Sequence, residues 1–173
     1  MIFETKRLIL REYRESDLDS LYQIISDPVT MKYYKKPYSY EDSKRWINWN
    51  LNNYKEYGFG LWAIVLKETN EFIGDCGITM QKIDGNLLPE VGYHIDKKYH
   101  RIGLGYEACQ VVMSWFFENT KYEDLYSYMT KENVGSYSLA IKNGMTKIKE
   151  YKDDDEDLLV YKITKDDWIK VNK

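Results

Sequence analysis

Apolar side chains recur every three or four residues along several stretches of this chain, which is the spacing of a helix with one buried face. The strongest such pattern begins at Leu104. Ser16 and Ser39 precede two earlier stretches and are expected to cap those helices. The segments with the pattern are 16–27, 39–58, 104–116 and 136–143. The chain is therefore expected to contain four helices.

Runs of β-branched and aromatic residues fall between these helices and are typical of strands. Short polar turns at 68–70 and 84–86 separate neighbouring runs and predict hairpins. The strand segments are 7–13, 60–67, 71–80, 88–96, 125–130, 145–151 and 158–163. The predicted order is β-α-α-β-β-β-α-β-α-β-β, which implies an α/β fold with a mixed sheet.

The size and composition of the chain limit the kinds of protein it can be. With 173 residues, 43% of them hydrophobic, it is long enough for one buried core, so residues 1–173 are expected to form a single domain. A formal net charge of −3 argues against nucleic acid and anionic membranes as partners. Cys76 and Cys109 lie in segments that look buried, as in a reduced protein, and residues 1–14 lack the apolar core of a signal peptide. The expected location is the cytoplasm.

A glycine-containing segment, His100-Arg101-Ile102-Gly103-Leu104-Gly105, lies between a predicted strand and the strongest predicted helix. Unpaired main-chain N–H groups and the helix dipole favour an anion there, and glycine lets the backbone approach phosphate oxygens. With Ala108 the segment also fits the dinucleotide pattern G-x-G-x-x-A, but a polar loop and several strands precede it, which argues against that fold. A tight turn without a ligand is the other alternative. No G-x-x-x-x-G-K-[ST] sequence occurs, which excludes a P-loop.

Further motifs occur in a fixed order on both sides of this loop. They include Thr5-Lys6-Arg7-Leu8, Ser26-Asp27-Pro28, Phe59-Gly60-Leu61-Trp62, Glu90-Val91-Gly92-Tyr93, and a segment from Asn133 to Met145 that fits N-x-x-S-x-x-[VL]-x-x-K-x-G-F except for its last residue. Together with the loop, which fits Q/R-x-x-G-x-G/A apart from its first residue, they resemble the GNAT superfamily. The branch they resemble contains the N-terminal acetyltransferases of ribosomal proteins. The resemblance implies the GNAT fold, a mixed, mostly antiparallel central sheet with helices on both faces.

The resemblance also implies a site for acetyl-CoA in a V-shaped split between the fourth and fifth predicted strands. The strand residues would pair with the pantetheine arm and the glycine loop would bind the pyrophosphate. The implied cofactor-binding residues are Tyr93, His94, Ile95, His100, Arg101, Ile102, Gly103, Leu104, Gly105, Tyr106, Asn133, Ser136 and Lys142. Because His100 and Tyr106 depart from the residues usual in the family, main-chain contacts carry this expectation. The N–H of His94 or Ile95 could polarise the acetyl carbonyl.

Acyl transfer from a thioester to an amine requires a proton acceptor but no covalent enzyme intermediate. The resemblance makes Glu90 the candidate base, directly or through water, although a glutamate is as often exposed or ion-paired. The tyrosine that relatives often use as an acid is replaced by Ala140, so Ser136 or Tyr137 is the candidate acid. Ser136 could equally be a helix cap.

The leading hypothesis is an acetyl-CoA-dependent N-acetyltransferase that acts on the primary amine of a protein N-terminus or a small molecule. The alternative is a catalytically silent acyl-CoA-binding or regulatory module. The isolated His94 and His100 give no metal-ligand spacing, so no metal is predicted. The tyrosine-rich segment 33–38 is expected to cover the acceptor pocket or to pack in a homodimer, and the acidic run 153–157 to be a solvated turn or to attract a cationic amine.

Overall fold

The structure, a computed structural model, describes residues 2–172. Its strands are β1 (Ile2–Glu4), β2 (Leu8–Arg11), β3 (Leu61–Leu66), β4 (Glu71–Ile83), β5 (Asn86–Ile95), β6 (Asp124–Thr130), β7 (Thr146–Asp153) and β8 (Glu156–Thr164). Its α-helices are α1 (Leu18–Ile25), α2 (Tyr40–Glu56), α3 (Leu104–Asn119), α4 (Val134–Lys142) and α5 (Lys165–Val171), and 3-10 turns occupy Glu15–Asp17 and Lys97–Tyr99. The predicted order of elements is confirmed, while β1 and α5 were not predicted.

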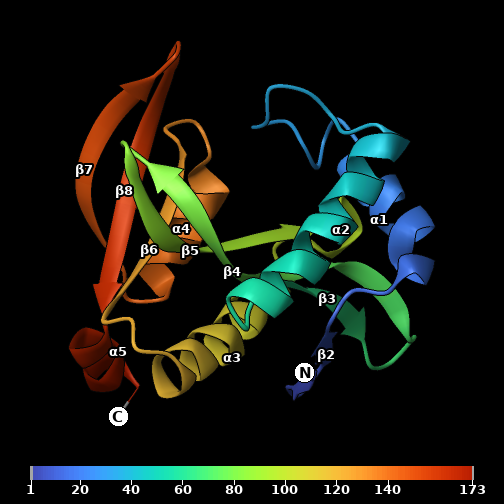
Figure 1. Ribbon diagram of the computed structural model, residues 1–173, viewed down its shortest axis with the longest axis horizontal. Helices are drawn as coiled ribbons and strands as arrows, with labels where there is room; N and C mark the ends of the chain where they lie inside the picture. Colours follow the sequence, from blue (N-terminus) through green and yellow to red (C-terminus); the bar gives the residue numbers. More distant parts are fainter. Residues whose placement is uncertain (1, 173) are drawn as a thin grey trace.

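The strands form one mixed sheet in the order β1-β2-β3-β4-β5-β6-β8-β7 (Figure 1). Neighbouring strands are antiparallel except β5 and β6, which are parallel. Within the described residues β5 and β6 pair at a single position, Glu90 opposite Tyr126, whereas β4 and β5 pair along ten positions. The sheet is therefore open beyond Glu90, between the C-terminal part of β5 and β6, as the resemblance implied.

Helices cover both faces of the sheet, and the alternation of side chains along β3 shows why. Leu61 and Ala63 belong to the apolar cluster formed with α1 and α2, whereas Trp62 and Ile64 belong to the cluster formed with α3. Successive residues of a strand point to opposite faces, so a run of buried residues needs a helix layer on each side. The α/β fold with helices on both faces is thus confirmed.

One of the two predicted helix caps is correct and one is wrong. Ser39 accepts the N–H of Asp42 at 3.1 Å and caps α2. Ser16 caps nothing, because a 3-10 turn comes first and α1 begins only at Leu18. The carboxylate that organises this turn is Asp17, which accepts the N–H of Arg14 and pairs with the Arg11 guanidinium at 2.7 Å.

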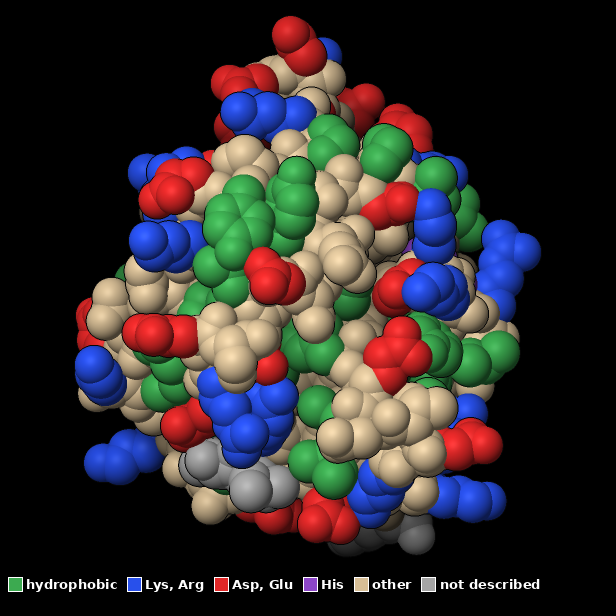
Figure 2. All heavy atoms as spheres, turned by 90° about the vertical axis from the view of Figure 1, so that its right-hand side faces the viewer, with side chains coloured by type: hydrophobic (Ala, Val, Ile, Leu, Met, Phe, Trp, Pro, Cys, Tyr) green, Lys and Arg blue, Asp and Glu red, His purple; other side chains and the backbone are tan. Residues whose placement is uncertain are grey.

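The molecule carries both signs of charge on the side of α1 and α2. Figure 2 shows Lys and Arg side chains interspersed there with Asp and Glu. This side therefore lacks the uniformly positive surface that would attract a polyanion. Among the helices described, none is both long and apolar enough to cross a membrane.

Candidate active site

A cleft of about 1080 Å³ opens where β5 and β6 separate. Its walls come from the loop before α2 and from α2 itself, from β4, β5, β6 and β8, from the first turn of α3 and from α4. The predicted site residues that line it are Glu90, Tyr93, His94, Ile95, His100, Arg101, Gly103, Leu104, Gly105, Tyr106, Asn133, Ser136 and Lys142. Ile102 is not part of this lining, because its side chain is 54% exposed and its carbonyl accepts a hydrogen bond from Arg7 at 2.9 Å. The candidate acid Tyr137 also lies outside the lining.

The glycine turn at one end of the cleft has the geometry of an anion site. Arg101 and Gly103 both have positive φ, 62° and 85°, and the intervening residue does not, so successive N–H groups form a concave nest. Gly103 is the N-cap of α3 and no side chain caps this helix. The first intrahelical bond runs from Glu107 N–H to the Gly103 carbonyl, which leaves the earlier N–H groups of the helix for a ligand.

An ion pair that the sequence did not indicate fixes this turn to the segment between β1 and β2. Glu107, in the first turn of α3, accepts hydrogen bonds from Thr5 Oγ1 at 2.6 Å, from Arg7 N–H at 2.8 Å and from Arg7 Nε at 2.7 Å. Burial alone would raise the pKa of Glu107, but these bonds outweigh it and lower the pKa. The turn is therefore held in place before any ligand arrives.

His100, the residue that departs from the family pattern, contacts the protein itself. Its Nε2 donates to the carbonyl of Ile95 at 2.8 Å and so ties the turn to the end of β5. Asp96, which follows Ile95, donates its N–H to the carbonyl of Ile73 on the β4 side. The main-chain N–H groups of consecutive strand residues point to opposite edges of the strand, so the N–H of Ile95 faces away from β4 and toward the open split.

The N–H of His94, in contrast, is already used. It donates to Oδ1 of Asp75 at 3.1 Å, and the imidazole Nδ1 lies 2.8 Å from the same oxygen. Of the two main-chain N–H groups considered as donors to the acetyl carbonyl, only that of Ile95 is still available, because that of His94 is bound to Asp75. Asp75 lies 19 residues before His94 and carries no sequence signal of its own.

Glu90 stands in the cleft wall with only 9% of its surface exposed. Among residues 2–172, no side chain or main-chain N–H donates a hydrogen bond to its carboxyl group. Burial raises its pKa to about 8. The alternative of an exposed or ion-paired glutamate is therefore wrong. A carboxyl group with this pKa can exchange a proton with an amine close to neutral pH.

The α4 side of the cleft contributes polar groups near the open split. Asn133 is the N-cap of α4, and its Oδ1 accepts the N–H of Ser136 at 3.1 Å. Ser136 is thus inside the first turn rather than at the cap, and its hydroxyl forms a hydrogen bond with the side chain of Tyr93, which also lines the cleft. Lys142 places its ammonium 4.3 Å from the centre of the Tyr106 ring, a cation–π contact beside the glycine turn.

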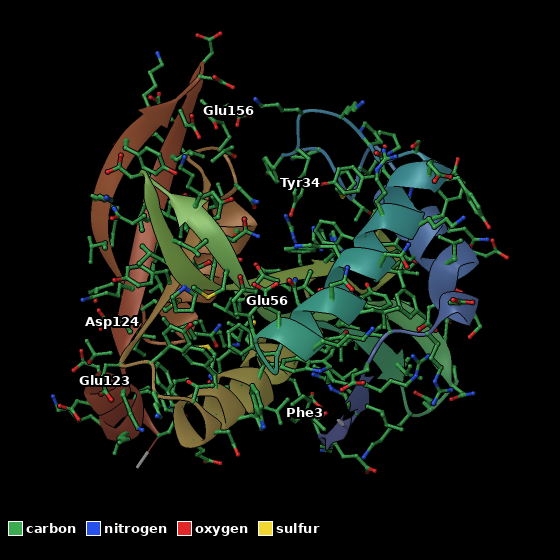
Figure 3. All side chains as sticks on the ribbon, in the orientation of Figure 1. Phe3, Tyr34, Glu56, Glu123, Asp124 and Glu156 are labelled. Carbon is green, nitrogen blue, oxygen red and sulfur yellow. The ribbon has the colours of Figure 1, made fainter. Side chains whose placement is uncertain are left out.

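The tyrosine-rich loop and the acidic run meet across the mouth of the cleft. Tyr34 and Tyr38 line the cleft, and Lys35 pairs with Asp154 of the β7–β8 hairpin at 2.7 Å. Figure 3 shows Tyr34 and Glu156 on opposite sides of the gap between this loop and the hairpin. Within residues 2–172 no group of three or more His, Cys, Asp and Glu side chains is placed to hold a metal ion.

A comparison with known protein families bears on the dinucleotide alternative for the glycine turn. A family model described as acetyltransferase (GNAT) domain matches residues 7–146. The chain belongs to the GNAT acetyltransferase family. The dinucleotide interpretation of the turn is thereby discarded, and acetyl-CoA, the acetyl donor of GNAT enzymes, becomes the ligand against which the cleft is judged.

Individual relatives agree with this assignment. The uncharacterized protein YkkB of Bacillus subtilis (strain 168) is 30% identical over 158 residues, which cover 91% of this chain and 92% of that protein. The crystal structure of an acetyltransferase from Agrobacterium tumefaciens superimposes with a TM-score of 0.81 at 26% identity, covering 94% of each chain. The ribosomal-protein acetyltransferase RimL in complex with coenzyme A shares the fold, with a TM-score of 0.77 at 17% identity over 95% of this chain and 98% of that one.

Proposed function

We propose that this GNAT protein transfers an acetyl group from acetyl-CoA to the primary amine of a protein N-terminus or a small molecule, by direct attack and without a covalent enzyme intermediate. The observation that carries the proposal is a cleft lined both by the main-chain anion nest before α3 and by the buried, unpaired carboxyl group of Glu90 on β5. The fold shared with RimL, whose structure contains coenzyme A, supports the choice of ligand.

The residues present fit coenzyme A. The nest at Arg101–Gly103 and the free N–H groups at the start of α3 would hold the pyrophosphate, with Lys142 nearby as a cation. The edge of β5 at Tyr93 and Ile95 is unpaired toward β6 and would bind the amide groups of the pantetheine arm as an added strand. Gly105 lets α3 lie against Ile95, where a Cβ atom would come within 3.3 Å of the Ile95 side chain.

Two groups of the protein would act on the reacting atoms. Glu90 would accept a proton from the incoming amine, directly or through water, and the N–H of Ile95 would stabilise the negative charge that develops on the acetyl oxygen. Ser136 is the remaining candidate for protonating the sulfur, because it lines the cleft beside Tyr93 and Tyr137 is not part of the lining. Binding, orientation and proton transfer account for the reaction with no covalent bond to the enzyme.

A silent acyl-CoA-binding module remains the second candidate, since Ala140 replaces the tyrosine that relatives often use as an acid. Calorimetry with coenzyme A, followed by free-thiol release from acetyl-CoA with a panel of amines, separates the two. The panel comprises short peptides with free N-termini, a polyamine, an amino sugar and an aminoglycoside. We expect binding of coenzyme A and amine-dependent thiol release. Binding without release from any amine would support the silent module, and absence of binding would overturn both functions.

A further inference from the structure

A chain of hydrogen bonds runs from the interior of the sheet to the acceptor side of the cleft. It begins at Asp75 on β4, passes through the imidazole of His94 on β5, and ends at the hydroxyl of Tyr34, which lies 2.6 Å from His94 Nε2. Tyr34 belongs to the loop between α1 and α2, 60 residues away from His94 in the sequence. None of the roles proposed above uses this chain.

Asp75 is fully buried and surrounded by hydrogen-bond donors. Its carboxylate accepts from Tyr13 Oη at 2.6 Å, from Trp46 Nε1 at 3.0 Å, and from the His94 main chain and Nδ1. Burial alone would raise its pKa, but His94 and these donors outweigh burial and lower it. A carboxylate with four donors and no room for its own proton stays ionised.

This arrangement fixes the proton on the imidazole of His94. Nδ1 faces a carboxylate and therefore carries the hydrogen, which leaves the lone pair on Nε2. Nε2 then accepts the hydroxyl proton of Tyr34. The imidazole is also held mechanically, because the rings of Tyr34 and Trp46 both lie 5.3 Å from it.

Tyr34 and Glu90 line the same cleft, and Glu90 is the charged group that acts most strongly on the Tyr34 hydroxyl. Glu90 and His94 are four residues apart on β5 and so project from the same face of the strand. The titratable groups around the Tyr34 hydroxyl are Glu90 and Tyr93 from β5, Asp75 from β4 and Tyr38 from its own loop. Burial, followed by the carboxylates of Glu90 and Asp75, raises the pKa of Tyr34 well above its usual range, so its hydroxyl keeps a proton to pass to His94.

The chemistry of acetyl transfer requires more than one proton acceptor. A primary amine reaches the cleft as an ammonium ion and loses one proton before it can attack and a second as the amide forms. Glu90 accounts for one of them. We propose that Tyr34 takes the second proton and that His94 and Asp75 relay it, a role that rests on the proposed acetyl transfer and completes it.

The C–N bond forms and the C–S bond breaks while the proton leaves the amine nitrogen for the Tyr34 oxygen, and the original Tyr34 proton moves to Nε2 of His94. The imidazolium ion is stabilised by Asp75 until it returns its proton through Tyr34 to water. The thiolate of coenzyme A takes one proton from the solvent or from Ser136, which the solvent replenishes. One proton in total is released for each ammonium ion acetylated.

The first test compares the activity of two tyrosine variants, with the most reactive amine of the panel as the substrate. Tyr34→Phe keeps the ring and removes the hydroxyl, and we expect kcat to fall by about 10²-fold with no change in the KM for acetyl-CoA. Tyr40→Phe removes an exposed hydroxyl that binds Asp19, outside the cleft lining, and should leave kcat unchanged. Equal rates for Tyr34→Phe and the wild type would overturn the proposal.

An alkoxyamine, which is weakly basic and already neutral at pH 7, separates the two proton acceptors. With this substrate the defect of Glu90→Gln should shrink, because the first proton is absent, whereas the defect of Tyr34→Phe should persist. A Tyr34→Phe defect that shrinks in parallel would show that Tyr34 only supports Glu90 and would contradict the relay.

A measurement without turnover tests the hydrogen-bond chain itself. Two-bond ¹H–¹⁵N spectra of the imidazoles at pH 7 should show His94 with its hydrogen on Nδ1, and Tyr34→Phe should shift the Nε2 resonance while Tyr40→Phe should not. A hydrogen on Nε2 would overturn the relay whether or not an acceptor amine is found. If the predicted tautomer is seen and no amine is acetylated, the chain is a structural feature and both the relay and the proposed function fail.

Discussion

The two ends of the cleft are built in different ways. The glycine turn presents main-chain N–H groups of residues that are consecutive in the sequence, and its concave shape depends on positive φ angles at Arg101 and Gly103. The end near Glu90 offers side chains from segments far apart in the sequence, buried and with shifted pKa values. The first end suits a constant feature of the coenzyme, the pyrophosphate, and the second suits proton transfer.

This difference predicts which kinetic parameter each end controls. Main-chain groups at the turn would bind the donor equally before and during the proposed reaction, so substitutions there should weaken binding. Groups at the Glu90 end act only while bonds change, so damage there should lower kcat. Variants confined to one end can break or sharpen this division.

The largest effect is expected for Glu90→Gln, which keeps the size of the side chain and removes its ability to accept a proton. We expect kcat to fall by about 10²-fold or more, with the Kd for coenzyme A unchanged. In the wild type kcat should rise with pH through about 8, because the buried carboxyl group must lose its proton before it can act. That rise should be absent from the pH–rate profile of the variant, and an unchanged profile would remove Glu90 from the mechanism.

The stability of the wild type and of Glu90→Gln provides an independent test of the raised pKa of Glu90. Because the pKa of Glu90 is raised in the folded state, its contribution to the free energy of unfolding is fully present below the unfolded pKa and is lost as the pH rises through about 8. Chemical unfolding of wild type and Glu90→Gln at pH 6 and pH 9 should therefore show the wild type losing more stability than the variant. Parallel losses would contradict the raised pKa.

An intermediate effect is expected for Gly103→Ala at the other end. Alanine at a φ of 85° is strained, and relief of the strain would turn the first N–H groups of α3 away from the pyrophosphate. We expect the Kd for coenzyme A to rise by about tenfold, measured by calorimetry, with kcat at saturation little changed. Gly85→Ala is the matched control, since its φ is 80° and its Cβ would meet no atom within 4 Å. A similar loss of affinity in both variants would mean that strain alone explains the effect.

The smallest effect is expected at the mouth of the cleft. Lys35 and Asp154 are each 72% exposed, and exposed ion pairs contribute little. Lys35→Gln should change the KM for the amine by less than about twofold at 150 mM salt. A tenfold increase in KM that disappears at 1 M salt would show instead that this pair controls access to the acceptor end.

The position of the glycine turn between a strand and a helix could be predicted from the sequence because the turn is local. His100 through Gly105 are consecutive, and their position between a strand and a strongly periodic helix defines the geometry almost completely. The role of His100 was nevertheless missed, because the Ile95 carbonyl that it binds becomes a partner only when the turn folds back on β5.

The acceptor end could be predicted only in part. Glu90 was found through a family resemblance, but its burial depends on contacts that no spacing reveals. Asp75 and Tyr34 flank His94 from positions 19 and 60 residues away, and Arg7 meets Glu107 across 100 residues. Single-sequence patterns describe periodicity within an element and contain little information about which elements meet. For the same local reason, the short β1 strand and α5 gave too few periodic positions to be recognised.

The single register pair between β5 and β6 leaves the ladder of main-chain hydrogen bonds incomplete at the middle of the sheet. A ligand arm bound along the free edge of β5, as proposed, would form the missing main-chain hydrogen bonds, so part of the free energy that a complete ladder would give the empty sheet would become affinity for that ligand. The ligand-free protein is therefore less stable than it would be with a complete sheet, and the gap between β5 and β6 is about as wide as one strand.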